Sequence, residues 1–175
     1  MKRNLLSLAA AFAAALMINL SANAQNSRND VGMVTSKSFH RASRVTTSAA
    51  TSEINSKAVR DFYRRFSEIS GESWFSVDNG FVVKFTKDGI QNRADYDKKG
   101  NLLTVFRYLN EDQLPHDVRH LVKSTYYDYG ITHIVEVSLN NTTAYLINIQ
   151  DKTTFKQLKV VNDEMEVTHD YVLAK

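Results

Sequence analysis

The sequence predicts an α+β domain in which two helices pack on one face of a mainly antiparallel sheet of about eight strands. Three observations carry this prediction: two segments with helical spacing of apolar residues, eight short β-rich runs, and an order in which one helix precedes four strands twice. The composition agrees, because 175 residues that are 43% hydrophobic and 23% charged are typical of a soluble globular domain.

The first 24 residues show the three-part pattern of a secretory signal peptide. Met1-Lys2-Arg3 is positively charged, residues 5–20 are apolar, and Ala22-Asn23-Ala24 supplies the small residues that a signal peptidase reads. The apolar run is shorter than the roughly 20 residues that span a bilayer. We therefore expect cleavage after Ala24 and a periplasmic or secreted protein; the alternative of a membrane anchor is less consistent with this length.

Residues 25–53 read as a flexible polar linker. They are dense in Ser, Thr, Asn, Arg and Ala, and their larger apolar residues show no helical or strand period. Four basic residues stand against Asp30 and Glu53, namely Arg28, Lys37, Arg41 and Arg44. We interpret the segment as a solvated spacer, with an arm that contacts an anionic envelope surface as the alternative.

The folded domain is expected over residues 54–175, and its first half, about 54–112, begins with a helix. Apolar residues recur there at helical spacing (Ala58, Val59, Phe62, Phe66 and Ile69), with Ser52 or Ser56 as cap and Gly71 as end. Four strands follow at 74–77, 81–86, 90–96 and 102–109. Gly80, Gly89 and Gly100 lie in the intervening turns, which is typical of an antiparallel meander.

The second half, about 113–175, repeats this order. Leu114-Pro115 starts a helix whose inner side carries Val118, Leu121, Val122 and Thr125. Strands are expected at 132–139, 143–149, 155–161 and 167–173. The halves align at an offset of 60, with Phe62 against Val122 and Trp74 against Ile134, so an internal duplication is plausible.

Alternation along the strands predicts which side chains meet the helices. Three strands supply them: Phe81, Val83 and Phe85; Val135, Val137 and Leu139; Tyr145, Ile147 and Ile149. The alternate positions would then form an open sheet face of mixed polarity. The candidate binding residues on that face are Lys84, Arg93, Glu136, Asn148 and Lys159.

The order of these pieces resembles the PepSY-like family of exported bacterial proteins, which is related to the β-lactamase-inhibitor-like fold. The resemblance covers about residues 59–173, and it is carried by the strand 81–85, the segment 94–103, Leu114-Pro115 and the strand 144–147. The chain departs from the family at 162–165, where the last turn has no glycine. The resemblance implies a tandem α-β4 domain, export, no enzymatic activity, and a role in binding or restraining an enzyme such as a peptidase.

Several chemistries find little support in the residues. Without cysteine there is no disulfide, thiol nucleophile or zinc ribbon. His116 and His120 lie four apart on one helical face and are weak candidates for a metal site, because no third ligand is fixed. Asp95 and Asp97 fit a turn better than a calcium loop or a pair that shares a proton. We therefore expect no cofactor and no catalytic residues.

Charge excludes one class of partner. The net charge of +3 falls to +1 without Lys2 and Arg3, so no basic surface for a nucleic-acid backbone is expected. The leading hypothesis is a non-enzymatic exported module that binds another envelope or secreted protein through the open face. The alternatives are a small-ligand or metal-binding periplasmic protein that uses His116 and His120, and a purely structural envelope component.

Overall fold

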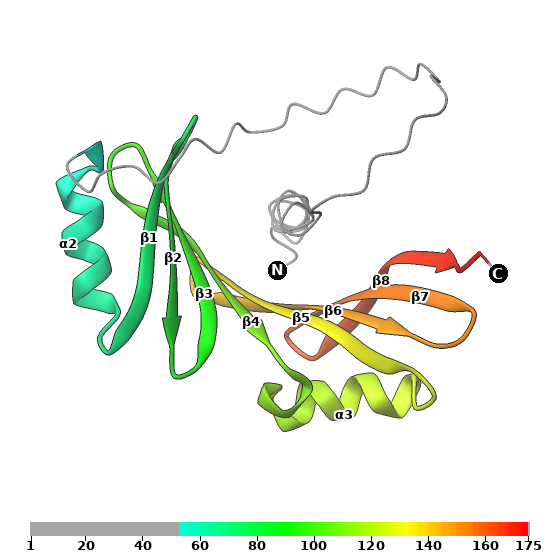
Figure 1. Ribbon diagram of the computed structural model, residues 1–175. Helices are drawn as coiled ribbons and strands as arrows, with labels where there is room; N and C mark the ends of the chain where they lie inside the picture. The colour runs from blue at the N-terminus through cyan, green and yellow to red at the C-terminus, as the bar shows by residue number, and fades with distance from the viewer. Residues whose placement is uncertain (1–52, 175) are drawn as a thin grey trace, which may run out of the picture. The chain divides into compact units, whose positions relative to one another are not determined.

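The computed structural model describes residues 53–174, which form one eight-stranded antiparallel sheet with both helices on the same side (Figure 1). Its elements in chain order are α2 (Ser56–Arg65), β1 (Ile69–Val77), β2 (Gly80–Lys87), β3 (Ile90–Asp97), β4 (Leu102–Leu109), the short 3-10 helix η3 (Glu111–Gln113), α3 (His116–Thr125), β5 (Gly130–Leu139), β6 (Thr142–Gln150), β7 (Thr154–Val161) and β8 (Glu164–Val172). Each strand pairs with its sequence neighbours. The predicted fold class is confirmed. The predicted signal peptide and, except for Glu53, the predicted linker lie outside the described residues.

Helix α2 is capped by Asn55. Its side chain accepts a hydrogen bond from the backbone N–H of Lys57 at 2.9 Å, and this satisfies one of the free donors at the helix start. The expected cap at Ser56 is therefore wrong, because Ser56 is already the first helical residue. Ser52, the other expected cap, lies outside the described residues.

The expected end of this helix at Gly71 is also wrong. The helix stops at Arg65 because Phe66 takes an extended conformation, and β1 begins at Ile69. Gly71 instead lies inside β1 with a φ of +62°, where the pairing with β2 shifts between Ser70 and Ser73. A positive φ costs glycine nothing, so glycine suits this bulge.

Two apolar clusters hold the helices on the sheet. Ala58 and Phe62 of α2 pack with Trp74, Val83, Phe85 and Ala94. The Phe62 ring meets those of Trp74 and Phe85 edge-to-face at centroid distances of 5.3 and 5.0 Å. Val118 and Val122 of α3 pack with Leu109, Ile134, Ile147 and Leu158. Each helix thus buries one narrow stripe. The stripe is shorter than the spacing predicted, because Thr125 of α3 is exposed and Phe66 and Ile69 follow the end of α2.

The two halves match closely in position. Helix α3 spans 116–125 and α2 spans 56–65, so the bounds differ by the predicted offset of 60. The buried helix residues Ala58 and Phe62 correspond to Val118 and Val122 at the same offset.

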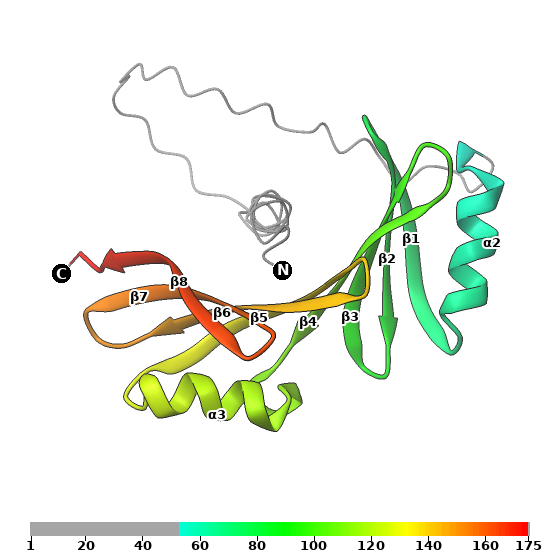
Figure 2. The ribbon, with the colours of Figure 1, turned by 180° about the vertical axis from the view of Figure 1, so that it is seen from behind.

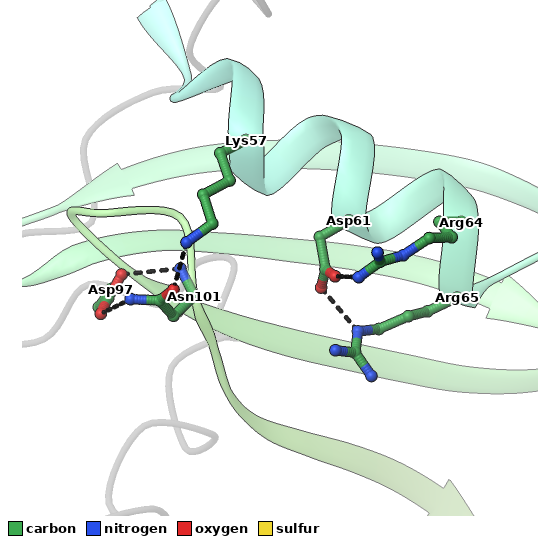
Figure 3. Close-up of polar contacts among 6 residues, drawn as sticks. All are labelled: Lys57, Asp61, Arg64, Arg65, Asp97 and Asn101. Carbon is green, nitrogen blue, oxygen red and sulfur yellow. Dashed lines mark hydrogen bonds and ion pairs between the residues drawn. The ribbon is translucent and has the colours of Figure 1, made fainter.

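The start of α2 sits on the β3–β4 turn, and Figure 3 shows the polar contacts on this side of the helix. Lys57 Nζ donates to Asn101 Oδ1 at 2.5 Å, and Asn101 in turn donates to Asp97. Gly100 has a φ of +75°, and a Cβ built there would lie 2.7 Å from the backbone nitrogen of Ala58. Only a glycine lets the helix approach the turn this closely.

The last hairpin forms its turn without glycine. Asn162 and Asp163 both have positive φ, 51° and 62°, as do Asn140 and Asn141 in the β5–β6 turn. Such pairs fit the two-residue hairpin turns whose twist matches the strands, and Asn and Asp tolerate this conformation best among residues with a Cβ. The hairpin at 162–165 therefore forms without a glycine in its turn.

Directly paired residues of antiparallel strands point to the same face, so the register assigns every side. Phe81, Val83 and Phe85 face α2, and Tyr145, Ile147 and Ile149 face α3, as expected. The expectation for β5 is wrong. Ile134 pairs with Leu109 and Ile147 under α3, which places Val135, Val137 and Leu139 on the opposite face.

The sheet curves so that α2 and α3 lie on its outer side in both views (Figure 1, Figure 2). We call the side opposite the helices the open face; within residues 53–174 no helix packs on it. No helix among the described residues is long and apolar enough to cross a membrane.

Candidate functional site: the open face of the sheet

The register brings four of the five predicted binding residues to the open face. Lys84 pairs with Arg93 across β2 and β3, and Arg93 pairs with Phe106 on β4. Asn148 and Lys159 lie on β6 and β7, where Lys159 pairs with Leu146. Phe106 pairs with Val137 of β5, so an apolar centre separates two polar groups of residues.

Glu136, the fifth predicted residue, lies on the other side of the sheet. It pairs with Arg107 and Tyr145, and Arg107 Nη1 donates to its two carboxylate oxygens at 2.9 and 3.1 Å. Burial raises the pKa of Tyr145, and the charge of Glu136 raises it further. Glu136 is therefore a buried carboxylate on the helix side, and its assignment to the open face is wrong.

The reason for this error is that β5 is buried on both faces. Ile134, Val135, Glu136 and Val137 are all buried, so alternation alone does not show which set meets the helices. A charged residue in an alternating strand usually lies on the exposed side, and this placed Glu136 on the wrong face. Arg107 on the neighbouring strand compensates its charge, which is what allows a carboxylate to occupy a buried position.

The first polar group of the open face is built around Arg93. Its guanidinium donates from Nε and Nη2 to the two carboxylate oxygens of Asp95 at 2.7 and 2.8 Å, and it lies 5.3 Å from the centroid of the Phe106 ring. Burial raises the pKa of Asp95, although Arg93 acts in the opposite direction. Lys84 beside this pair is exposed, and its Nζ lies 5.6 Å from the centroid of the Phe75 ring.

These contacts give the first group a fixed geometry. A bidentate pair and a ring contact hold Arg93 in one orientation, which an isolated surface arginine would not have. Asp95 is occupied by Arg93, whereas Asp97 has another partner. Asp97 accepts from the backbone and side chain of Asn101, which lowers its pKa. The two acids have different partners, so they do not form a pair that shares a proton.

The second polar group is a ladder of side chains across β6, β7 and β8. Gln157 donates from Nε2 to Asn148 Oδ1 at 3.1 Å, and its Oε1 lies 3.1 Å from His169 Nδ1. The rings of His169 and Tyr171 stack at 5.9 Å. Lys159 forms an ion pair with Glu166 at 2.5 Å. The ladder presents amide, imidazole and phenol groups side by side.

Sequence reasoning missed most of this ladder. Gln157, His169 and Glu166 were not candidates, although Gln157 lies on β7 with the candidate Lys159 and the other two lie on the neighbouring strand β8. Alternation along β7 could have identified Gln157, because it shares a face with Lys159. The partners of these two residues on β8 depend on a bulge. The pairing shifts between Gln157 and Leu158, and no local pattern predicts that shift.

The predicted histidine pair lies away from the open face, on the outer side of α3. The rings of His116 and His120 stack at a centroid distance of 6.2 Å, and both residues are exposed. His116 Nδ1 also lies 3.3 Å from Asp117 Oδ1. Across residues 53–174, no group of three or more His, Asp or Glu side chains is placed to hold a metal ion.

Comparison with known proteins supports the fold. No family model matches the sequence, and neither does any curated protein. Among solved structures, a BLIP-like protein of Bacteroides fragilis aligns with a TM-score of 0.58 and 15% identity over 70% of this chain and 88% of its own. A DUF2874 family protein of Bacteroides ovatus aligns with a TM-score of 0.57 and 14% identity over 68% of this chain and 87% of its own.

A third similar structure, from Bacteroides eggerthii, is described as periplasmic and aligns with a TM-score of 0.56 and 12% identity over 68% of this chain and 88% of its own. At these identities the likeness establishes the architecture. The chain has a BLIP-like α+β fold.

Proposed function

We propose that this protein is an exported, non-enzymatic module that binds another envelope or secreted protein through the open face. The observation that carries the proposal is the construction of that face. Arg93 is held by Asp95 and Phe106, and Gln157 links Asn148 to His169, on a side that carries no helix within residues 53–174. Side chains ordered before binding lose less entropy when a partner docks.

The composition of the face suits a protein partner. Tyr is enriched at protein interfaces, and Tyr171 is exposed on this face, whereas Arg93 and Phe106 are buried within it and support the exposed side chains around them. The BLIP-like neighbour supports the same use of the fold. The sequence also resembles the PepSY-like family, whose members are associated with peptidase inhibition. A peptidase is therefore the first enzyme class to test as the partner that this protein inhibits.

Export is the second part of the proposal. Cleavage after Ala24 would release a chain whose residues 25–53 tether a domain of two α-β4 halves, about 54–112 and 113–175. The periplasmic description of one structural neighbour supports this location. Peptide sequencing of the protein from its source cell tests it, since the proposal expects Gln25 at the mature N-terminus.

Partner capture tests the binding function. The chain from Gln25 onward would be immobilised and exposed to the envelope and secreted fractions of the source cell, with bound proteins identified by mass spectrometry. A saturable, stoichiometric partner supports the proposal, and that partner is then assayed for inhibition. An empty capture by well-folded bait contradicts it and favours the small-ligand alternative.

A further inference from the structure

The outer side of α2, opposite the open face, carries a concentration of positive charge. Six exposed cations gather there and on the adjoining β3–β4 turn: Lys57, Arg60, Arg64, Arg65, Lys98 and Lys99. The Asn55 side chain donates to the backbone oxygen of Lys98 at 3.0 Å, so turn and helix start are in contact. We call these six residues the α2 basic surface; the near-neutral net charge did not indicate it, because acidic residues elsewhere in the domain balance these cations.

Part of this charge is neutralised locally and part is not. Asp61 pairs with Arg64 and, at 2.7 Å, with Arg65, as Figure 3 shows. Arg60, Lys98 and Lys99 have no ion-pair partner within residues 53–174. Lys57 donates to the neutral side chain of Asn101, so four of the six cations lack an ion-pair partner within residues 53–174. The basic and acidic residues of the domain, 16 and 17, are nearly balanced overall.

The second half of the molecule provides an internal comparison. Helix α3 has the same length and buries residues at the same two positions as α2. The four cationic positions of α2, 57, 60, 64 and 65, correspond at the offset of 60 to Asp117, His120, Ser124 and Thr125. The two cations of α3 lie at other positions and have partners, because Arg119 pairs with Glu111 and Lys123 donates to the backbone oxygen of Tyr129. Packing on the sheet therefore does not require the cations of α2.

We propose that the α2 basic surface docks on an anionic lipid surface. The chain outside the structure supports this occupant, because residues 25–52 carry four basic residues and one acid and lead directly into α2. Those four basic residues would add to the positive charge that α2 presents to a lipid headgroup layer. Each Lys or Arg close to an anionic membrane strengthens binding by about fivefold at physiological salt.

The position of α2 makes this docking compatible with the open face. The helix lies on the outer side of the sheet, so a membrane against α2 would leave the open face directed away from the lipid (Figure 1). Lipid docking and partner binding would then use opposite sides of the same domain. The inference does not depend on the proposed function, since each surface is tested by its own substitutions.

Vesicle binding tests the inference. The chain from Gln25 onward would be sedimented with phosphatidylglycerol-containing vesicles and with phosphatidylcholine vesicles at 50 mM salt. We expect binding to the anionic vesicles only, and its loss at 0.5 M salt, where the Debye length falls to a few ångströms. Absence of binding to anionic vesicles at low salt, or equal binding to both lipids, would overturn the proposal.

Charge reversal then locates the surface. Arg60→Glu and Lys99→Glu should each reduce the partition onto anionic vesicles at least tenfold, because an attraction is replaced by a repulsion. Lys152→Glu, an exposed residue of the β6–β7 turn with the same change of charge, is the matched control and should change it less than threefold. Equal losses in all three variants would show that net charge alone acts and would refute an α2 surface. Circular dichroism confirms folding of each variant.

Discussion

The contact between α2 and the β3–β4 turn can be measured with two glycine substitutions. Gly100 and Gly89 have nearly equal φ angles, +75° and +73°. A Cβ at Gly100 would lie 2.7 Å from the Ala58 nitrogen and 3.0 Å from the Lys57 Cβ, whereas nothing lies within 4 Å of a Cβ at Gly89. The backbone cost of alanine is therefore shared, and the steric cost is confined to Gly100.

The magnitudes follow from these two terms. A left-handed conformation costs a non-glycine residue about 1–2 kcal/mol, which is the whole effect expected for Gly89→Ala. Forcing an extra methyl group into a packed contact adds roughly 1–3 kcal/mol. The obstructing atom is helix backbone, so α2 itself must shift, and Gly100→Ala should reduce the free energy of unfolding by about 2–5 kcal/mol.

Urea denaturation followed by tryptophan fluorescence measures both variants, because Trp74 lies in the cluster beneath α2. The difference between Gly100→Ala and Gly89→Ala reports the helix–turn contact after the shared backbone term cancels. Equal destabilisation by the two substitutions would refute the close contact between α2 and the β3–β4 turn. A larger loss for Gly89→Ala would refute the assignment of the steric term.

Three further predictions concern separate parts of the molecule. Backbone hydrogen bonds from Thr153 and Thr154 lower the pKa of Asp151 to about 2, below the ordinary unfolded value of about 3.9. Its charge therefore stabilises the fold above about pH 4, and that contribution is lost as the pH falls toward 2. Urea titrations should show the stability advantage of the wild type over Asp151→Asn shrinking between pH 5 and pH 2; a constant difference would contradict this. Glu136→Ala should lower the unfolding free energy by about 1–3 kcal/mol, because a buried partner of Arg107 is removed, while partner capture is retained. If Glu136→Ala lost partner capture without losing stability, Glu136 would belong to the binding surface after all. Zinc should leave the thermal midpoint unchanged, since two exposed imidazoles supply only part of a tetrahedral site. A stabilisation that His120→Ala removes would instead identify a metal site.

The sequence predicted those parts of the fold that depend on local periodicity. The helical spacing of Ala58 and Phe62, the proline before α3 and the glycine turns each depend on nearby residues, and the elements they predict are present. Boundaries were less accurate, because the cap at Asn55 and the early end at Phe66 depend on how the chain enters the sheet.

The candidate site depended on pairing between distant strands, which periodicity does not encode. Lys84 and Arg93 were placed on one face because β2 and β3 form a simple hairpin. The face of Glu136 could not be read, because its partner Arg107 lies 29 residues away on β4. The link from Gln157 to His169 likewise required the register of β7 against β8, including its bulge.

The most direct test of the central claim is partner capture by variants that change one side of the sheet at a time. The triple variant Lys84→Ala, Asn148→Ala, Lys159→Ala removes three side chains from the open face, and His120→Ala changes the outer side of α3. We expect the triple variant to lose the captured protein while it remains folded, and His120→Ala to retain it. Undiminished capture by the folded triple variant, or loss of capture by His120→Ala alone, would contradict binding through the open face.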